Sequence, residues 1–452
     1  MNAPPTRHPA SYRDPAGFVF EKDGILHRSI HPLHRSAYQT LMQSGLYDRL
    51  VQQNLLIPHE VVERPNSADT FLVIKPQRIH PIMAPWHWTY DMLKQAALLT
   101  LKIQQISLEY GMSLKDAHPS NIQFIGSAPI LIDTLSLGHW ETEKPWVAYR
   151  QYCESFLLPL VTGNYLGAES PQLLRAWPNG LPLNTGRKLL PLRSKLYLHW
   201  LLHIHLNARQ FITRKSSDWH QPTFSAPKMK NLLRSLQLAT EKCRAAPNHS
   251  EWINYENDVQ DRGEYSRHKL NLIKQETDQL PQVNSIVDLG SNTGVYSQTL
   301  QRDERKIIQL ESDSQTLNRL YLRNLQAQHK NCTTFCLNIE ELLPAGQDPN
   351  RIPSIRSDLV LCLGLLHHLT YRNNIPLTDV LNLLHQLSNR HLWIEFIDPA
   401  DPLIVEFFNP DIVAKRPVDQ LTFEAELQKL FTIRFQSNLT DSTRRLYLCS
   451  KK

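Results

Sequence analysis

The chain has 452 residues, of which 41% are hydrophobic and 20% are charged, a composition typical of globular proteins rather than disordered ones. This length exceeds that of one ordinary core and predicts two or three domains. No apolar run approaches the roughly 20 residues that span a bilayer, and the start of the chain lacks a secretory pattern, so we expect a cytoplasmic protein.

Charge is divided unevenly along the chain. Residues 251–452 hold 22 Lys+Arg and 26 Asp+Glu (net −4), whereas residues 1–250 hold 27 and 17 (net +10). A basic front half is compatible with an acidic substrate, nucleic acid or a membrane surface as partner, and equally with a solvated surface. Nucleic acid is not favoured, because there is no dense Lys/Arg run and no aromatic array interleaved with basic residues. The six cysteines lack paired metal-type spacing and read as buried free thiols.

The front part of the chain predicts an α+β domain. Residues 1–16 are rich in proline and polar groups and predict a tail without fixed structure. The elements expected in the front domain (17–145) are two strands in 17–30 around a turn at Asp23-Gly24, a helix from Ser36 to about residue 50, a strand in 71–76, and a long helix that Thr89 caps and Gly111 ends.

A short segment after the long helix resembles the catalytic segment of protein kinases. In residues 113–138, Asp116 and Asn121 have the D-x-x-x-x-N spacing, and Asp133 stands where kinases place a second metal-binding aspartate. The front domain lacks a G-x-G-x-x-G loop, and Lys75 follows the helix that the kinase lysine should precede. We favour an inactive kinase-like relic, or a loop fixed by hydrogen bonds, over an active phosphotransferase.

Residues 146–250 predict a helical linker or lid, with 216–230 as its most flexible segment. His199, His203 and His205 invite a metal site. His199 and His203 lack the intervening glutamate of H-E-x-x-H zinc sites, and packing among aromatic neighbours explains all three, so no metal is expected.

The strongest pattern lies in residues 285–297, SIVDLGSNTGVYS. An apolar run typical of a buried parallel strand ends at Asp288-Leu289, and Gly290 and Gly294 allow a tight turn close to a ligand. A second apolar run, in 306–311, ends at Glu311, which follows Gly294 by seventeen residues and is placed to hold a ribose diol.

Further strands are expected in the stretches 332–342, 357–369, 391–402, 431–438 and 444–451. Together, residues 251–452 resemble the class I S-adenosylmethionine-dependent methyltransferases. The resemblance implies a Rossmann-like α/β fold with a seven-stranded sheet, and S-adenosylmethionine as cofactor. The whole chain is also similar to bacterial proteins with the same front segment, some of them grouped with nodulation-associated methyltransferases.

The resemblance also implies roles for individual residues. The residues expected around the methionine part of the cofactor are Asp288, Gly290, Ser291, Asn292 and Gly294. Glu311 would hold the ribose, Asn338 and Ile339 would frame the adenine, and Leu363 and Gly364 would lie under the sulfonium. Two positions depart from the family pattern: Asn292 stands where many members have glycine, and Asn338 where many have aspartate.

Methyl transfer depends chiefly on alignment, so no catalytic side chain is obligatory. For a hydroxyl acceptor, His368 or His367 after the fourth strand and Glu395 on the fifth are candidate proton acceptors. An N-P-P-Y or D-P-P-Y segment is absent, which argues against methylation of exocyclic amines on DNA bases and of glutamine. An oxygen acceptor on a small molecule, saccharide or lipid-linked precursor is the first choice. RNA methylation, a bifunctional protein with a phosphotransferase-like front half, and a non-catalytic scaffold remain as alternatives.

Overall fold

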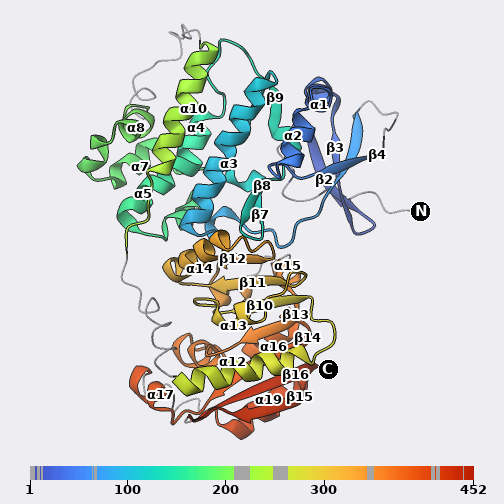
Figure 1. Cartoon of the computed structure of the whole chain (residues 1–452), viewed down its shortest axis with the longest axis vertical. Coiled ribbons are helices and arrows are strands. Elements are labelled where there is room, and N and C mark those ends of the chain that lie inside the picture. The colour runs from blue at the N-terminus through green and yellow to red at the C-terminus, as the bar shows by residue number, and fades with distance from the viewer. Residues whose placement is uncertain are drawn as a thin grey trace. The chain divides into compact units, whose positions relative to one another are not determined.

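The computed structural model describes residues 6–7, 11, 14–63, 65, 69–207, 224–247, 263–343, 351–408, 413, 418–440 and 442–452. The chain forms two compact units: Met1–Ile79 with Met83–Trp86 and Tyr90–Pro247, and Asn248–Lys452 with His80–Ile82 and His87–Thr89. Figure 1 shows the elements of each. Among the described helices, none combines the length and apolar character needed to cross a bilayer. All six cysteines are buried free thiols, as the sequence predicts.

The first unit begins with a five-stranded antiparallel sheet in the order β1-β2-β3-β5-β4. Its strands and first helices are β1 (Thr6–Arg7), β2 (Gly17–Lys22), β3 (Ile25–Ile30), η1 (Pro32–His34), α1 (Arg35–Gln43), α2 (Leu46–Gln52), β4 (His59–Glu63) and β5 (Leu72–Pro76). The predicted hairpin is confirmed: φ is 54° at Asp23 and 73° at Gly24, the values of a tight primed turn.

Helices make up most of the remainder of the first unit. The elements are η2 (Pro85–His87), α3 (Tyr90–Glu109), β6 (Met112–Leu114), η3 (Pro119–Asn121), β7 (Ile122–Ile125), β8 (Ala128–Leu131), η4 (Thr134–Ser136), β9 (Leu137–His139), α4 (Tyr149–Tyr152), η5 (Cys153–Leu157), α5 (Leu158–Leu166), η6 (Ser170–Gln172), α6 (Leu173–Ala176), α7 (Leu183–Leu189), η7 (Leu192–Leu196), α8 (Leu198–Trp200), η8 (Leu201–Leu206) and α10 (Ala226–Glu241). The long helix predicted after Thr89 is confirmed as α3, and α10 packs along it.

Three expectations for the first unit differ from the structure. The helix predicted from Ser36 is two helices, because Gly45 adopts φ 84° between α1 and α2. Within the tail expected to lack structure, Thr6–Arg7 pairs with β2 and Asp14 bonds Arg28. Of the expected flexible segment, residues 226–230 are helical and 216–223 lie outside the described residues.

The second unit is built on the predicted seven-stranded sheet, in the order β12-β11-β10-β13-β14-β16-β15. Strand β16 runs antiparallel to its two neighbours, and the other pairings are parallel. The strands are β10 (Ser285–Leu289), β11 (Lys306–Glu311), β12 (Cys332–Cys336), β13 (Ser357–Cys362), β14 (Ser388–Ile397), β15 (Phe431–Asn438) and β16 (Arg444–Lys451).

Helices connect these strands and cover the sheet. They are α12 (Gly263–Asp278), α13 (Val295–Thr299), α14 (Ser314–Gln326), η9 (Ile339–Leu342), α15 (Arg351–Ile355), η11 (His368–Arg372), α16 (Leu377–Leu387), α17 (Pro402–Phe407) and α19 (Gln420–Leu430). The central strands are apolar on both faces: Ile286, Val287, Leu359 and Val360 are fully buried. Because β10, β11, β12 and β13 are parallel, their carboxyl ends meet at one edge of the sheet, where ligands bind in such folds.

Candidate active site

The glycine loop (residues 290–294) leaves the end of β10 through a backbone that few residues adopt. φ is 64° at Gly290, 48° at Asn292 and 76° at Gly294. Asparagine tolerates this left-handed region better than other side chains, which explains how Asn292 replaces the glycine of the family pattern. A Cβ on Gly294 would lie 2.8 Å from both Leu320 Cδ1 and Gln309 Nε2, so glycine is required there.

Glu311 fixes this loop from the neighbouring strand. The Asn292 backbone N–H donates to Glu311 Oε2 at 3.0 Å, and the N–H groups of Ser312 and Asp313 donate to Oε1 at 2.7 and 3.0 Å. Burial raises the pKa of Glu311, and these hydrogen bonds oppose the shift. Among the described residues Oε2 accepts this one bond, so it retains capacity to accept a hydroxyl of a ligand.

A buried polar layer supports the loop from behind. Gln309 Nε2 donates to Ser297 Oγ at 2.9 Å, and Asn324 Nδ2 donates to Gln309 Oε1 at 2.8 Å. All three residues are buried, so each bond fixes a side chain in the interior. This layer was not predicted from the sequence, although Gln309 interrupts the apolar run of β11 between Ile308 and Leu310.

Several oxygen atoms at the loop have no hydrogen-bond partner among the described residues. They are Asp288 Oδ2, Ser291 Oγ and Asn292 Oδ1, and all three are buried. Burial raises the pKa of Asp288 to about 7, with a hydrogen bond from Ser297 opposing the shift and the charge of Glu311 adding to it. An unsatisfied buried polar atom costs about 1–3 kcal/mol, so three together fit a site that a polar ligand completes.

The other predicted cofactor residues lie at the same edge of the sheet. Asn338 follows β12, is exposed, and caps η9 by accepting the Glu340 N–H at 3.4 Å; Ile339 is buried. Leu363 and Gly364 follow β13, which pairs with β10. Leu363 packs in the hydrophobic core of the unit, and Gly364 turns the chain with φ 64°.

Glu395 lies in a buried cluster of charges. Lys269 Nζ contacts Glu395 Oε2 at 2.7 Å, and Tyr265 donates its hydroxyl to Oε1 at 2.8 Å. The side chains of Lys269 and Glu395 are 2% and 0% exposed. Arg444 lies 4.0 Å from Glu395 Oε1 and bonds Asp401 at 3.3 Å. Tyr265 and Lys269, both from α12, thus form one cluster with Glu395 and Arg444.

These contacts decide the protonation state of Glu395. Burial acts to raise its pKa, but the charges of Lys269 and Arg444 outweigh burial and lower it to about 2. A carboxylate that is fully ionised and bonded through both oxygens is a poor proton acceptor. The geometry therefore favours a positioning role for Glu395 over the catalytic one that the sequence suggested.

His367 and His368 follow β13, and His368 begins η11. Their ring centroids are 4.1 Å apart, and Phe408 packs against both, at 5.7 and 5.5 Å. Burial lowers the pKa of His367 far below its usual range, and burial together with Arg372 lowers that of His368 to about 4. Both imidazoles are thus neutral at pH 7, the form that accepts a proton, although their basicity is reduced.

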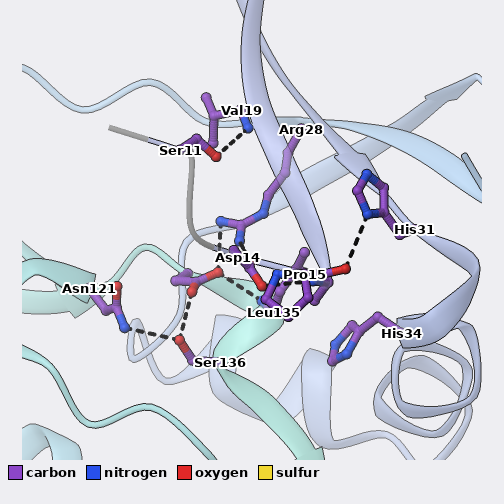
Figure 2. A network of polar contacts seen from close by, with 12 residues as sticks. Ser11, Asp14, Pro15, Val19, Arg28, His31, His34, Asn121, Leu135 and Ser136 are labelled. Carbon is purple, nitrogen blue, oxygen red and sulfur yellow. Dashed lines mark hydrogen bonds and ion pairs between the residues drawn. The ribbon is translucent and has the colours of Figure 1, made fainter. Parts of the chain in front are cut away.

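Two of the kinase-like residues, Asn121 and Asp133, belong to a network of hydrogen bonds and ion pairs in the first unit (Figure 2). Arg28 of β3 binds Asp133 Oδ1 at 2.7 Å and Asp14 Oδ2 at 2.6 Å. Asp133 also accepts the Leu135 N–H at 2.9 Å and the Ser136 hydroxyl at 2.7 Å, and Asn121 donates to Ser136 at 3.1 Å. Both oxygens of Asp133 are therefore occupied by protein donors, and Arg28 supplies the positive charge.

Asp116 is also occupied by local contacts. Its Oδ1 accepts the His118 N–H at 3.0 Å and the Gln151 side chain at 2.7 Å. Within the described chain, no group of three or more His, Cys, Asp or Glu is arranged to hold a metal ion. His199 and His203 share Ser235 as a partner, and His205 contacts Ser194. Hydrogen bonding accounts for each of these residues.

Replacing Arg28 by methionine is expected to destabilise the first unit by about 2–3 kcal/mol, because Asp133 loses a charged hydrogen-bond partner in a partly buried site. The matched control is Lys75→Met: its ion pair with Glu60 is exposed, and removing it should cost less than about 1 kcal/mol. The measurement is peptide-resolved hydrogen exchange across a urea series. Equal effects of the two substitutions would show that the Arg28 network is not structural.

No protein-family model matches the chain. It is 27% identical over 425 residues to the nodulation protein NoeA of Rhizobium meliloti (strain 1021), covering 88% of this chain and 87% of that protein. Solved structures also align with parts of the chain. The N-methyltransferase NodS from Bradyrhizobium japonicum WM9, in complex with S-adenosyl-L-homocysteine, covers 44% of this chain and 94% of its own, at 10% identity and a TM-score of 0.35.

The magnesium protoporphyrin IX methyltransferase ChlM from Synechocystis PCC 6803, with bound SAH, covers 46% of this chain and 90% of its own, at 12% identity and a TM-score of 0.32. The fold of the second unit is defined by its sheet, which has seven strands, a single antiparallel member and a glycine loop after β10. The chain is similar over most of its length to a nodulation protein, and its second unit has the α/β fold with a seven-stranded sheet that the sequence resemblance implied.

Proposed function

We propose that the chain is an S-adenosylmethionine-dependent methyltransferase that binds its cofactor at the carboxyl edge of the second unit's sheet. One observation carries the proposal: the Asn292 N–H of the glycine loop donates to Glu311 on the next strand, while the buried atoms Asp288 Oδ2 and Ser291 Oγ have no hydrogen-bond partner among the described residues. S-adenosylmethionine, when bound, supplies a methyl group on a positively charged sulfur.

Different residues at this edge of the sheet would bind different parts of the cofactor. Asp288 Oδ2 is a carboxylate oxygen that no described residue bonds, and it would hold the cofactor's ammonium group. Glu311 would accept hydrogen bonds from the ribose hydroxyls with the capacity its carboxylate retains. We assign the remaining contacts as the resemblance implies: the methionine part to Gly290, Ser291, Asn292 and Gly294, the adenine to Asn338 and Ile339, and the sulfonium end to Leu363 and Gly364.

Proton transfer from an acceptor hydroxyl falls to His367 or His368. Both are neutral and follow the strand next to β10, whereas Glu395 is held ionised by Lys269. In this scheme Glu395 and Lys269 position Tyr265 and α12 beside the loop.

The acceptor we propose is an oxygen of a small molecule, a saccharide or a lipid-linked precursor, with RNA as the second candidate. Incubating the full chain with methyl-labelled S-adenosylmethionine and a host extract, then separating RNA, protein, lipid and small molecules, distinguishes them. We expect label in the lipid or small-molecule fraction. Label confined to RNA would favour the second candidate, and bound cofactor without any labelled product would favour a non-catalytic scaffold.

The affinity for S-adenosylmethionine is expected to depend on pH through Asp288. Its pKa is raised to about 7, so the carboxylate is ionised above pH 7 and protonated below it. Because an ammonium group binds the ionised form, the dissociation constant should be about tenfold higher at pH 6 than near pH 7.5. Titration calorimetry checks this: Asp288→Asn should bind weakly with a flat profile, and the control Glu304→Gln, at an exposed acid, should keep the wild-type profile. A flat wild-type profile would contradict the assignment.

A further inference from the structure

A cluster of leucines on the first unit points away from its core. The five are Leu189, Leu192, Leu196, Leu198 and Leu202, which are 41% to 87% exposed. They belong to α7, η7, α8 and η8, and we call them the leucine face; α7 and α8 lie at one margin of the unit in Figure 1. Single exposed leucines are ordinary, but several within one short segment mark an interaction surface.

Contacts on the opposite side of these helices keep the leucine face outward. Trp200 donates its indole N–H to the Ala239 carbonyl at 3.0 Å, and His203 bonds Tyr149 and Ser235 at 2.9 and 2.8 Å. Leu198 and Leu202 are four residues apart on the outer side. The helices α8 and η8 therefore cannot turn to bury Leu198 and Leu202 without losing these buried bonds.

Within residues 170–207, which contain the leucine face, every charged residue is basic; the acid Glu241 of α10 lies near enough to act on Tyr197. Residues 170–207 contain no Asp or Glu, and Lys188, Arg193 and Lys195 lie exposed among the leucines. None of the three forms an ion pair with a carboxylate among the described residues; the Arg193 guanidinium lies 5.0 Å above the ring of Tyr165. Residues 1–250 as a whole carry a net charge of +10.

We propose that the leucine face binds the surface of a bilayer that contains anionic lipids. The leucines would contact the acyl boundary while the neighbouring Lys and Arg side chains face lipid phosphates. The absence of Asp and Glu from residues 170–207 suits binding to a negatively charged surface. A second copy of the chain fits less well, because a symmetric contact would bring the same cations together. Nucleic acid would engage the cations but leave the leucines in water. The proposal does not rest on the methyltransferase function.

Vesicle flotation of the full chain tests the proposal. We expect it to float with vesicles of phosphatidylcholine and phosphatidylglycerol, but not with phosphatidylcholine alone, and to be released at 1 M salt because the screening length falls to about 3 Å. Leu192→Ser with Leu196→Ser should lower the partition coefficient at least about tenfold. Lys188→Gln with Lys195→Gln should lower it roughly 25-fold, from about fivefold for each charge.

Matched controls separate this face from the rest of the surface. Leu33→Ser removes a leucine that is 79% exposed in η1, and Lys102→Gln removes an exposed charge on α3; both should float like the wild type. Equal flotation with neutral and anionic vesicles, no flotation, or unchanged flotation of the leucine variant would overturn the proposal. So would light scattering that shows a dimer dissociated by the leucine substitutions without any vesicle binding.

Discussion

Replacing Lys269 by methionine is expected to destabilise the second unit by about 3–5 kcal/mol, because the Glu395 carboxylate would remain buried with its main counter-charge removed. Glu395 is wholly buried, and its Oε2 atom is the one that Lys269 contacts, at 2.7 Å. Tyr265 and the more distant Arg444 compensate only in part. Peptide-resolved hydrogen exchange across a urea series measures the effect in α12 and β14.

Two comparisons make this result specific. The double variant Lys269→Met with Glu395→Gln should recover most of the loss, because no unpaired charge is left inside. Lys429→Met breaks an exposed pair with Glu426 and should cost less than about 1 kcal/mol. If Lys269→Met were no more harmful than Lys429→Met, the buried pair would not support the fold as described.

The ion pair of Lys269 with Glu395 also predicts how the stability of the second unit changes at low pH. The pKa of Glu395 is lowered from 4.5 to about 2, so its contribution to stability is present above about pH 4.5 and is lost as the pH falls towards 2. The variant Glu395→Gln in the Lys269→Met background should lack this component.

Strands β10, β11 and β13 were predictable because each is dominated by a short apolar run, and the start of β15 because apolar and polar residues alternate there. The approach of Glu311 to the glycine loop was also predictable, because neighbouring parallel strands bring their carboxyl ends together. The ion pair of Lys269 with Glu395 was not, since 126 residues separate the partners and no local pattern links a helix to the fifth strand of a later sheet.

The first unit shows where local patterns mislead. The spacing of Asp116, Asn121 and Asp133 was visible, but the side chain that neutralises Asp133 is Arg28, in a hairpin a hundred residues earlier. Strand β4 (His59–Glu63) was missed because it is an edge strand with mostly exposed side chains and no apolar alternation. The sequence predicts one helix across Gly45, since a single glycine is often tolerated within a helix, but Gly45 adopts a positive φ and ends α1.

Replacing Glu311 by alanine is expected to weaken S-adenosylmethionine binding at least about 100-fold. The substitution removes a carboxylate that both fixes the Asn292 N–H of the glycine loop and would accept the ribose hydroxyls; hydrogen bonds to charged groups contribute about 1.5–3 kcal/mol each. The affinity of Glu311→Gln for S-adenosylmethionine should lie between those of the wild type and Glu311→Ala, because the amide oxygen of glutamine still accepts hydrogen bonds. The matched control is Glu304→Ala, an exposed acid just before the same strand.

Titration calorimetry of the full chain with S-adenosylmethionine tests the account most directly. We expect the wild type and Glu304→Ala to bind one molecule per chain, and Glu311→Ala to give no measurable saturation over the same concentrations. A wild type that does not bind, or a Glu311→Ala variant that binds as tightly as the wild type, would contradict a cofactor site at the ends of β10 and β11.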